Sequence, residues 1–548
     1  MCEVGVRSVD NFWGYAHDSK LSFKLCPHGY CCGTETVSCT SFSTCAPGRT
    51  GLLCGSCKPD YKQNFVGGNC IPKLESCDSQ VFVVYFIVYT LSYTVVFVLI
   101  TNAKDIIMHL KGLCSRNNSR TEPSITENST ELPIAGFVQM VILFFQVASL
   151  LQVKFKGGEQ QVSESKSRLR ESITELFNFR YTIYQQLCPS DELTLPQKEM
   201  ILFGMKLTTF IHLLSLAIAY ATLQVLARFL RNKISLLSTT PSEEPSIELT
   251  SSLTGEELSS KESDLQEEIR PTLSFMNMLK FTFIKLLKLY FIPVIKSALM
   301  MVHCVTIRDE SHLYVYADQV CYSIWQWGIL LIMLPGLLMF PICFEMILRL
   351  LKGRQISSWQ FIIAAAFPYY GVILYFWKRT QNSNNPIATT SHYLSKEEHV
   401  FRKSILESEE WLFREIEGRS LGWQIVQLYR SFAITFLSIF IINPIYRQLT
   451  YAAIFLVFIV HDRNREPYKH PYLNLLQCLT CRCLLLVLLC NVIPAMSYLV
   501  NVQTIPSIYE VVRMLGMLEL VIFAVVPLSL PIWKIKSYID NRHKIRTE

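Results

Sequence analysis

Long apolar runs are the sequence feature that most constrains this fold. The 548-residue chain contains nine runs of about 20 residues, the length a helix needs to cross the hydrocarbon core of a membrane. They lie at 81–101, 134–153, 201–228, 277–302, 324–348, 424–442, 445–461, 475–499 and 509–533. Because a lipid-exposed backbone must satisfy its own hydrogen bonds, the runs predict an all-α polytopic membrane bundle.

The composition agrees with a lipid bilayer as the main partner. Hydrophobic residues make up 50% of the chain and charged residues only 17%, below the roughly 25% of soluble proteins. The net charge of +7 is spread over many short loops, so it bears on orientation in the membrane. We therefore expect no nucleic-acid partner.

A tenth apolar run decides the topology. Residues 361–377 are short for a span and are interrupted by Pro368. If this run crosses, the basic loop at 461–472 and the basic tail lie outside; if it dips in and returns, both are cytoplasmic, as the positive-inside tendency favours. We prefer a re-entrant or interfacial segment. The result is a plasma-membrane protein with nine crossings, an extracellular N-terminus and a cytoplasmic C-terminus, although the basic outer loop at 154–200 argues the other way.

Cysteine usage divides the chain. Ten of its 19 cysteines precede residue 78, which indicates an oxidised, extracellular framework. A zinc site at the Cys54 and Cys57 pair is the alternative, but no histidine-containing second half follows at zinc-finger spacing. No secretory signal precedes this region, so we expect either a truncated N-terminus or insertion directed by the first span.

Five regions follow from these patterns. We expect an extracellular cysteine-rich module at 1–80, three spans at 81–230 with the outer loop 154–200, a disordered cytoplasmic linker at 231–275, a C-terminal transmembrane bundle at 276–533 and a cytoplasmic tail at 534–548.

A second cysteine pair tests this orientation independently of charge. Cys304 and Cys321 bound the loop between the fourth and fifth spans, which lies outside in this scheme. There they can form a disulfide. Two unpaired thiols, or a bridge from one of them to Cys188, are the alternatives.

Ionisable residues within spans are the candidate functional residues, because burying charge in a membrane is costly. Lys285, Lys288 and Lys296 fall within a sector of about 80 degrees of the fourth helix. Glu345 in the fifth span and Glu519 in the last are the available carboxylates. Pairing would line a polar cavity or bind a lipid phosphate; snorkelling of the amines toward headgroups is the alternative.

Enzyme signatures are absent from the sequence. It contains no GxxxxGK[ST], HExxH or GxSxG motif, so we expect no catalytic residue, no cofactor and no metal site. Prolines interrupt several spans, notably in LPGLLMFP and VVPLSLP, which suits channels and transporters that bend.

The spacing of four cysteines in the N-terminal region carries a resemblance. Cys45, Cys54, Cys57 and Cys70, with the intervening glycines and an aromatic residue, resemble the second half of a laminin-type EGF-like module. That resemblance implies the pairs Cys45–Cys54 and Cys57–Cys70. The chain departs from the pattern at Asp60, where a turn glycine is usual.

A wider resemblance covers nearly the whole chain. The segments GRTGLLCGSC, YRSFAITF and REPYKHPYLNLLQ, with the Cys304–Cys321 loop, resemble a group of uncharacterised multi-pass invertebrate membrane proteins. More distantly, the C-terminal spans are similar to the TRP-like family of fungal flavin carriers and polycystin-related channels. That similarity implies a cation channel or a lipid or solute carrier.

The resulting hypothesis is a cation channel or related transport protein with a ligand-sensing ectodomain. Its expected partners are the bilayer, an extracellular ligand at the EGF-like module and, as an open question, further copies of the same chain. A cell-surface adhesion or signalling receptor and a lipid transporter or scramblase are the alternatives.

Overall fold

A computed structural model of the chain describes 8, 11–27, 29–32, 40–63, 70–73, 79–101, 134–151, 195–237, 275–384, 398–403, 405, 422–465, 468, 471–499 and 506–547. Most of the predicted outer loop, with Cys188, and most of the predicted linker lie outside these residues. The prediction of a mostly helical chain with a small disulfide-bonded strand region near its N-terminus is confirmed.

Helices occupy all nine ranges that the apolar runs predict. They are α1 (Ser79–Thr101), α3 (Ile134–Leu151), α5 (Leu195–Leu237), α7 (Phe275–Met300), α8 (Ile324–Gly328) continuing into α9 (Leu334–Lys352), α13 (Gly422–Phe440), α14 (Pro444–Arg465), α15 (Pro471–Cys490) followed by α16 (Val492–Leu499), and α17 (Pro506–Thr547).

Several boundaries differ from the predicted ones. Helix α5 extends to Leu237, into the range assigned to the linker, and α17 continues through the predicted tail to Thr547. Polar sequence does not end a helix unless a breaker such as Gly or Pro is present, and neither stretch has one.

Three described helices are long and apolar enough to cross a membrane by length and composition. They are Ile324–Lys352, Pro444–Arg463 and Tyr472–Met496. Shorter apolar helices lie at Phe82–Ser92, Met140–Leu151, Thr208–Leu223, Ile425–Phe440 and Met514–Ser529. The chain therefore has several membrane-type helices, and the number of crossings stays a prediction.

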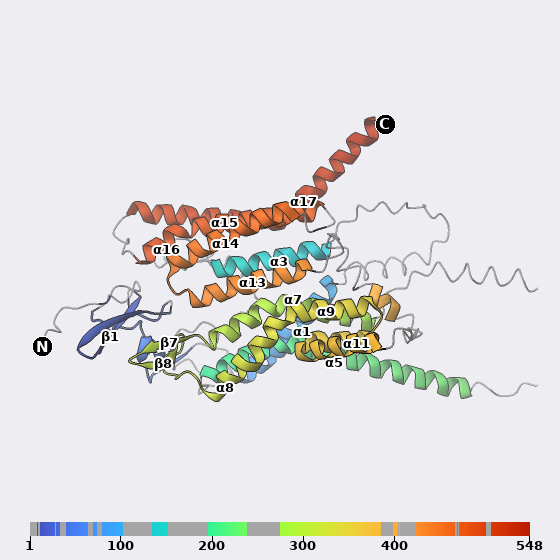
Figure 1. Ribbon diagram of the computed structural model, residues 1–548, viewed down its shortest axis with the longest axis horizontal. Helices are drawn as coiled ribbons and strands as arrows, with labels where there is room; N and C mark the ends of the chain where they lie inside the picture. Colours follow the sequence, from blue (N-terminus) through green and yellow to red (C-terminus); the bar gives the residue numbers. More distant parts are fainter. Residues whose placement is uncertain are drawn as a thin grey trace, which may run out of the picture.

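Helix α7 lies at the centre of the bundle. Its Ile292 packs among α3, α13, α14, α15 and α17, its Leu286 among α1, α3 and α5, and its Phe291 against α9 and its neighbours. In Figure 1 the first group lies above α7, while α1, α5 and α9 lie below it. The helix that carries the predicted lysine row thus joins three apolar clusters.

The tenth apolar run forms two helices separated by a sharp break. Helix α10 (Ser358–Ala366) ends at Phe367, whose backbone is not helical, and α11 (Pro368–Asn384) starts at the proline. A proline disfavours the α conformation in the residue before it, which explains the position of the break.

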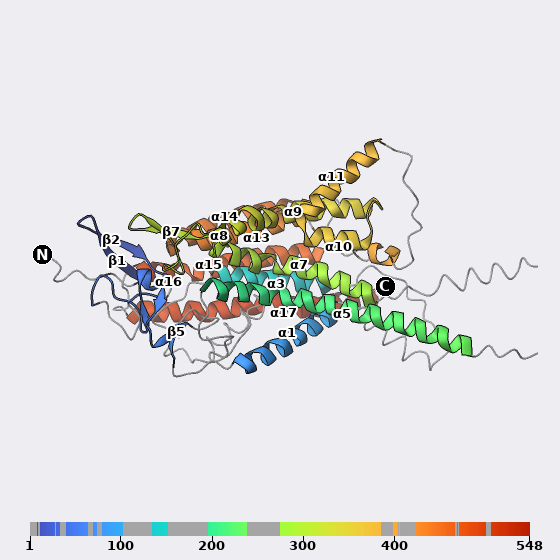
Figure 2. The same cartoon turned by 90° about the horizontal axis from the view of Figure 1, so that it is seen from below.

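Both helices pack against α9 rather than continuing in one line. A Cβ on Gly371 would lie 2.8 Å from the carbonyl oxygen of Ala364 and 2.3 Å from Sγ of Cys343. In a straight helix, residues seven apart are about 10 Å apart along the axis, so the chain folds back here. Figure 2 shows α11 leaving toward the end of the bundle where α17 ends. This geometry agrees with the re-entrant interpretation.

Two other helices are irregular. A π-helical turn at Ile329–Met333 joins α8 to α9, immediately before Pro335. Asn491 separates α15 from α16 and donates its side-chain Nδ2 to the carbonyl of Val487, 2.7 Å away. Such irregularities are where membrane helices bend, because nearby groups replace the missing backbone bonds.

Short strands form a cap at one end of the bundle. Two-stranded antiparallel pairs join β1 (Phe12–His17) to β2 (Lys20–Leu25), β3 (Arg49–Thr50) to β4 (Ser56–Cys57), β5 (Tyr61–Gln63) to β6 (Cys70–Pro72), and β7 (Cys304–Ile307) to β8 (Glu310–Leu313). Both views place these strands at the end opposite the C-terminus. We call this assembly, residues 11–73 with 301–322, the cap.

Candidate functional site

Four disulfides hold the described part of the cap. They join Cys26 to Cys31, Cys45 to Cys54, Cys57 to Cys70 and Cys304 to Cys321. The second and third are the pairs that the EGF-like resemblance implies. The fourth is the pair expected for the loop between α7 and α8. Whether the module is EGF-like stays a prediction.

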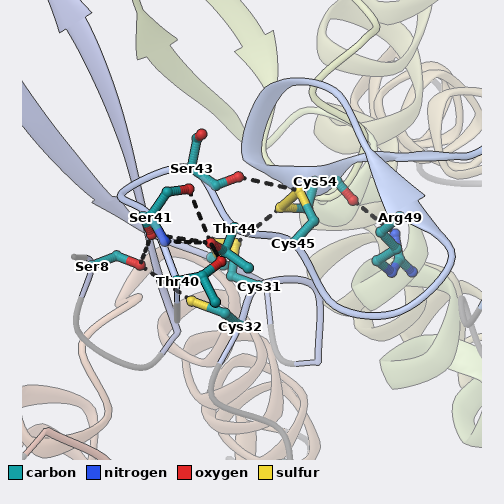
Figure 3. Close-up of a disulfide and its surroundings, with 11 residues drawn as sticks. Ser8, Cys31, Cys32, Thr40, Ser41, Ser43, Thr44, Cys45, Arg49 and Cys54 are labelled. Carbon is teal, nitrogen blue, oxygen red and sulfur yellow. Dashed lines mark hydrogen bonds between the residues drawn. A yellow bond between two sulfur atoms is a disulfide. The ribbon is translucent and has the colours of Figure 1, made fainter. Parts of the chain in front are cut away.

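Two of these bridges stack at the centre of the cap. Sγ of Cys31 lies 3.4 Å from Sγ of Cys54, so the first two bridges touch (Figure 3). Arg49 donates from Nη1 to the carbonyl oxygen of Cys54 at 3.0 Å, and its guanidinium lies over the ring of Tyr30. Arg49 is 3% exposed, and burial lowers its pKa. Covalent bonds and the buried Arg49 therefore take the place of a large apolar core.

The N-terminal module and the loop between α7 and α8 share one core. Trp13, Tyr30 and Leu53 of the module form a buried cluster with Ile307 and Ala317 of the loop. Two cysteine-stapled segments separated by more than 200 residues thus fold as one unit. They must lie on the same side of any membrane.

Glycines allow this close approach. A Cβ on Gly55 would lie 2.8 Å from the backbone nitrogen of Ala317. Gly51 has a φ of +83°, in the left-handed region, and a Cβ there would lie 2.9 Å from Oδ1 of Asp318. A side chain at either position would push the module away from the loop.

The cap is tied directly to the helices. The ring of His303 contacts Tyr314 of the loop and Phe440, the last residue of α13, at tilted angles and with ring centroids 4.8 and 5.0 Å away. Gln326 of α8 donates to the carbonyl of Met301, one residue beyond α7, at 3.1 Å. Movement of the cap would therefore reach α7, α8 and α13.

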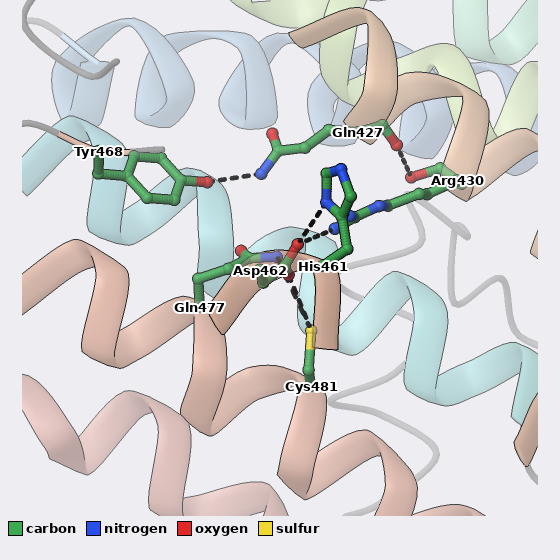
Figure 4. Close-up of polar contacts among 8 residues, drawn as sticks. Gln427, Arg430, His461, Asp462, Tyr468, Gln477 and Cys481 are labelled. Carbon is green, nitrogen blue, oxygen red and sulfur yellow. Dashed lines mark hydrogen bonds and ion pairs between the residues drawn. The ribbon is translucent and has the colours of Figure 1, made fainter. Parts of the chain in front are cut away.

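A buried polar cluster lies near the opposite end, between α13, α14 and α15 (Figure 4). Arg430 and Asp462 form an ion pair of 2.6 Å, and the side chain of Asp462 is 1% exposed. Oδ2 of Asp462 accepts from Nε2 of Gln477 at 3.0 Å and contacts Sγ of Cys481 at 3.6 Å. We call these residues, with His461, the Asp462 cluster.

The rings around Arg430 fix its position. His461 stacks on Trp423 with centroids 5.2 Å apart, and Arg430 lies over Trp423 at 4.9 Å and over Phe458 at 4.4 Å. Nη2 of Arg430 donates to Nδ1 of His461 at 2.9 Å, because an arginine can only donate.

A second group of bonds orders the loop between α14 and α15. Tyr468 is 1% exposed and its hydroxyl accepts from Nε2 of Gln427 at 2.5 Å. The side chain of Asn474 bonds both the backbone N–H and the carbonyl of Tyr468, each at 2.8 Å. Burial raises the pKa of Tyr468. Two of the segments that carry the wider resemblance, YRSFAITF and REPYKHPYLNLLQ, thus lie close together here, although no sequence pattern singled out Asp462.

The predicted lysines of α7 lie beside aromatic rings. Nζ of Lys285 lies 4.2 Å from the ring centre of Phe281, and Nζ of Lys288 lies 4.6 Å from that of Phe344 on α9. Both are half-buried, as is Lys296. Cation–π contact partly replaces water around an amine, and whether the row lines a cavity stays a prediction.

Both predicted carboxylates have polar partners in the structure. Glu345 is buried and pairs with Arg349, one turn further along α9. Glu519 is buried on α17 and accepts from Nδ2 of Asn491 at 3.4 Å. A residue one turn away is the simplest partner to reach, and the sequence prediction did not weigh Arg349.

Comparisons with known proteins give no name for this arrangement. No family model, curated protein or solved structure matches the chain. The resemblances stated above therefore stay predictions, and what stands is a membrane-type helical bundle with a disulfide-stapled cap. Among the described residues, no three His, Cys, Asp or Glu side chains gather as a metal site would require.

Proposed function

We propose that this chain is a multi-pass plasma-membrane protein that conducts cations, or moves a related solute, under the control of an extracellular ligand bound by the cap. The proposal places the cap outside, because its disulfides form and persist in an oxidising compartment. The opposite end of the bundle, with the end of α17, is then cytoplasmic.

One observation carries the proposal: the module and the α7–α8 loop share a core, and α7 contacts three helix clusters. A ligand that shifts the module acts on the central helix through packed side chains. The π-helical turn before α9 and the break between α10 and α11 give the bundle places to bend. The same coupling would serve a receptor, whereas half-buried lysines and buried carboxylates favour transport.

Reconstitution tests the proposal. The full chain in liposomes should pass cations, and Glu345→Gln or Glu519→Gln should change the ratio of permeant ions. Glu345→Gln also releases Arg349, so Arg349→Gln serves as its control. Silence under stretch, calcium, voltage and candidate ligands would count against transport.

The alternatives give different results in the same preparation. A lipid transporter or scramblase should exchange labelled headgroups between leaflets, and Lys285→Ala with Lys288→Ala should abolish the exchange. A receptor should bind its ligand through the cap with neither ion nor lipid movement. The full chain is needed for this assay, because the module shares its core with the α7–α8 loop.

A further inference from the structure

Arg402, near the end of the bundle away from the cap, is buried with unused donors. It is 6% exposed, and neither Nε nor Nη1 has a hydrogen-bond partner among the described residues. A guanidinium keeps its charge in proteins and prefers planar, bidentate acceptors such as phosphate. Because unpaired buried donors are costly, a partner outside the described residues fits here.

The groups around Arg402 carry an excess of positive charge. Burial lowers the pKa of Arg402, the nearby Arg354 lowers it further, and the nearby Glu398 opposes both effects. Oε1 of Glu398 accepts from the backbone N–H of Ser358 at 3.0 Å, and Nζ of Lys280 donates to Oγ of the same serine at 2.9 Å. Lys280 and Glu398 thus both bond to Ser358, while Arg354 and Glu398 lie near enough to Arg402 to act on its charge.

The start of α10 adds to this field. Ser357 caps the helix, accepting from the backbone N–H of Gln360 at 3.2 Å. The helix is nine residues long, and its N-terminal end carries partial positive charge. Anions bind readily at such an end when other donors converge on it.

An apolar stripe leads away from this group along α10. Trp359, Ile363 and Phe367 follow one another at one-turn spacing and are 46%, 48% and 65% exposed. Nζ of Lys280 lies 4.7 Å from the ring centre of Trp359, an arrangement typical of residues at a membrane interface. An acyl chain fits the stripe, while a free anion makes no use of it.

We propose that Arg402, Arg354 and Lys280, beside the start of α10, bind the phosphate of an anionic phospholipid, whose acyl chains lie along Trp359, Ile363 and Phe367. The lipid comes from the leaflet at the end of the bundle opposite the cap. The proposal rests on the proposed function only for the presence of a bilayer, and not on transport.

Lipid retention by the full chain tests this site. The protein is placed in nanodiscs of phosphatidylcholine containing a small fraction of phosphatidic acid, and retained lipid is identified by native mass spectrometry. Wild type should enrich phosphatidic acid. Arg354 has a left-handed backbone conformation, which asparagine tolerates, so Arg354→Asn should keep the local fold. The variant should lower the enrichment about tenfold, which corresponds to the loss of one charge-assisted hydrogen bond. Arg402→Gln should remove it.

Matched controls make the result decisive. Arg379→Asn removes one exposed charge from α11, and it should retain lipid as wild type does. Arg354 is also exposed, so its variant should keep the fold even if Arg402→Gln does not. Equal losses in the Arg354 and Arg379 variants would overturn the proposal, as would enrichment that survives Arg354→Asn.

Two further results separate this proposal from its alternatives. Inorganic phosphate at millimolar concentration should not displace the lipid; full displacement would overturn the lipid assignment in favour of a free-anion site. The assay reads binding without flux. Retention without transport would therefore contradict only the proposed function, and transport without retention only this site.

Discussion

The cap and the Asp462 cluster hold separate segments of the chain together by different kinds of contact. They lie at opposite ends of the bundle, and each joins several segments of the chain through buried contacts. The cap uses four described disulfides and a buried arginine over a tyrosine ring. The Asp462 cluster uses one ion pair, whose remaining bonds are supplied by an amide, a thiol and a histidine.

The difference teaches where each strategy is available. Covalent bridges constrain the unfolded chain and need an oxidising compartment. A buried ion pair stabilises only while both partners remain, because each desolvated charge depends on the other. We expect the Asp462 cluster to tolerate single substitutions less well than the cap tolerates the loss of one bridge.

The largest effect should come from breaking the ion pair. Asp462→Ala leaves Arg430 buried without its partner and should lower the free energy of unfolding by roughly 3–5 kcal/mol, measured by chemical denaturation in detergent. The double variant Arg430→Met, Asp462→Leu should recover much of this loss. If the single and double variants were equally unstable, the pair would matter through packing and not through charge.

Removal of a cap bridge should cost less. The chain-entropy relation assigns about 3 kcal/mol to a bridge such as Cys304–Cys321, whose sequence separation is 17, and about 2 kcal/mol to Cys26–Cys31, with a separation of 5. In one variant both cysteines of Cys304–Cys321 are replaced by serine, and in another both cysteines of Cys26–Cys31. Hydrogen exchange of the β7 and β8 amides in the two variants measures the difference in stability. A loss confined to the bundle would contradict a cap that folds as one unit.

Acid should loosen the cap at His303. Burial lowers the pKa of His303 from 6.5 to about 4, so the folded state holds it neutral while the unfolded chain gains a proton below its ordinary pKa. Its contribution is complete above the unfolded pKa and is lost as the pH falls toward 4. A drop from about pH 7 to about pH 5 should therefore cost roughly 2 kcal/mol.

A variant isolates that contribution. His303→Asn removes the titrating group, so the slope of stability against pH in this window should flatten. An unchanged slope would assign the pH dependence to groups other than His303; Asp318, whose pKa is raised by burial, gives a slope of the opposite sign.

The smallest effect should come from the surface pair between the module and the loop. His17 and Asp309 lie 2.7 Å apart, but the Asp309 side chain is 85% exposed. Exposed ion pairs contribute about 0–1 kcal/mol to stability, so Asp309→Asn should lower the free energy of unfolding by less than about 1 kcal/mol. A larger loss would show that the cap depends on charge as the Asp462 cluster does.

The sequence by itself determined the helices and part of the covalent framework, because the pairing of Cys26 with Cys31 could not be deduced from it. Apolar runs of membrane length placed all nine helical regions, since hydrophobic length is a local property. The break at Pro368 also followed from local chemistry, whereas the re-entrant interpretation rested on the distribution of basic loops along the whole chain. The Cys304–Cys321 pair followed from the predicted side of its loop.

Only the tertiary structure decided which distant groups meet. Asp462 is one acid at the end of an apolar run, and nothing local distinguishes it from a solvated residue until α13 and α15 place Arg430 and Gln477 beside it. The union of the N-terminal module with the α7–α8 loop is of the same kind, as is the burial of Arg402 beside α10. Contacts between residues tens to hundreds of positions apart depend on how the helices pack. The periodicity of one helix shows which of its faces is apolar, but it does not show which helices pack against that face.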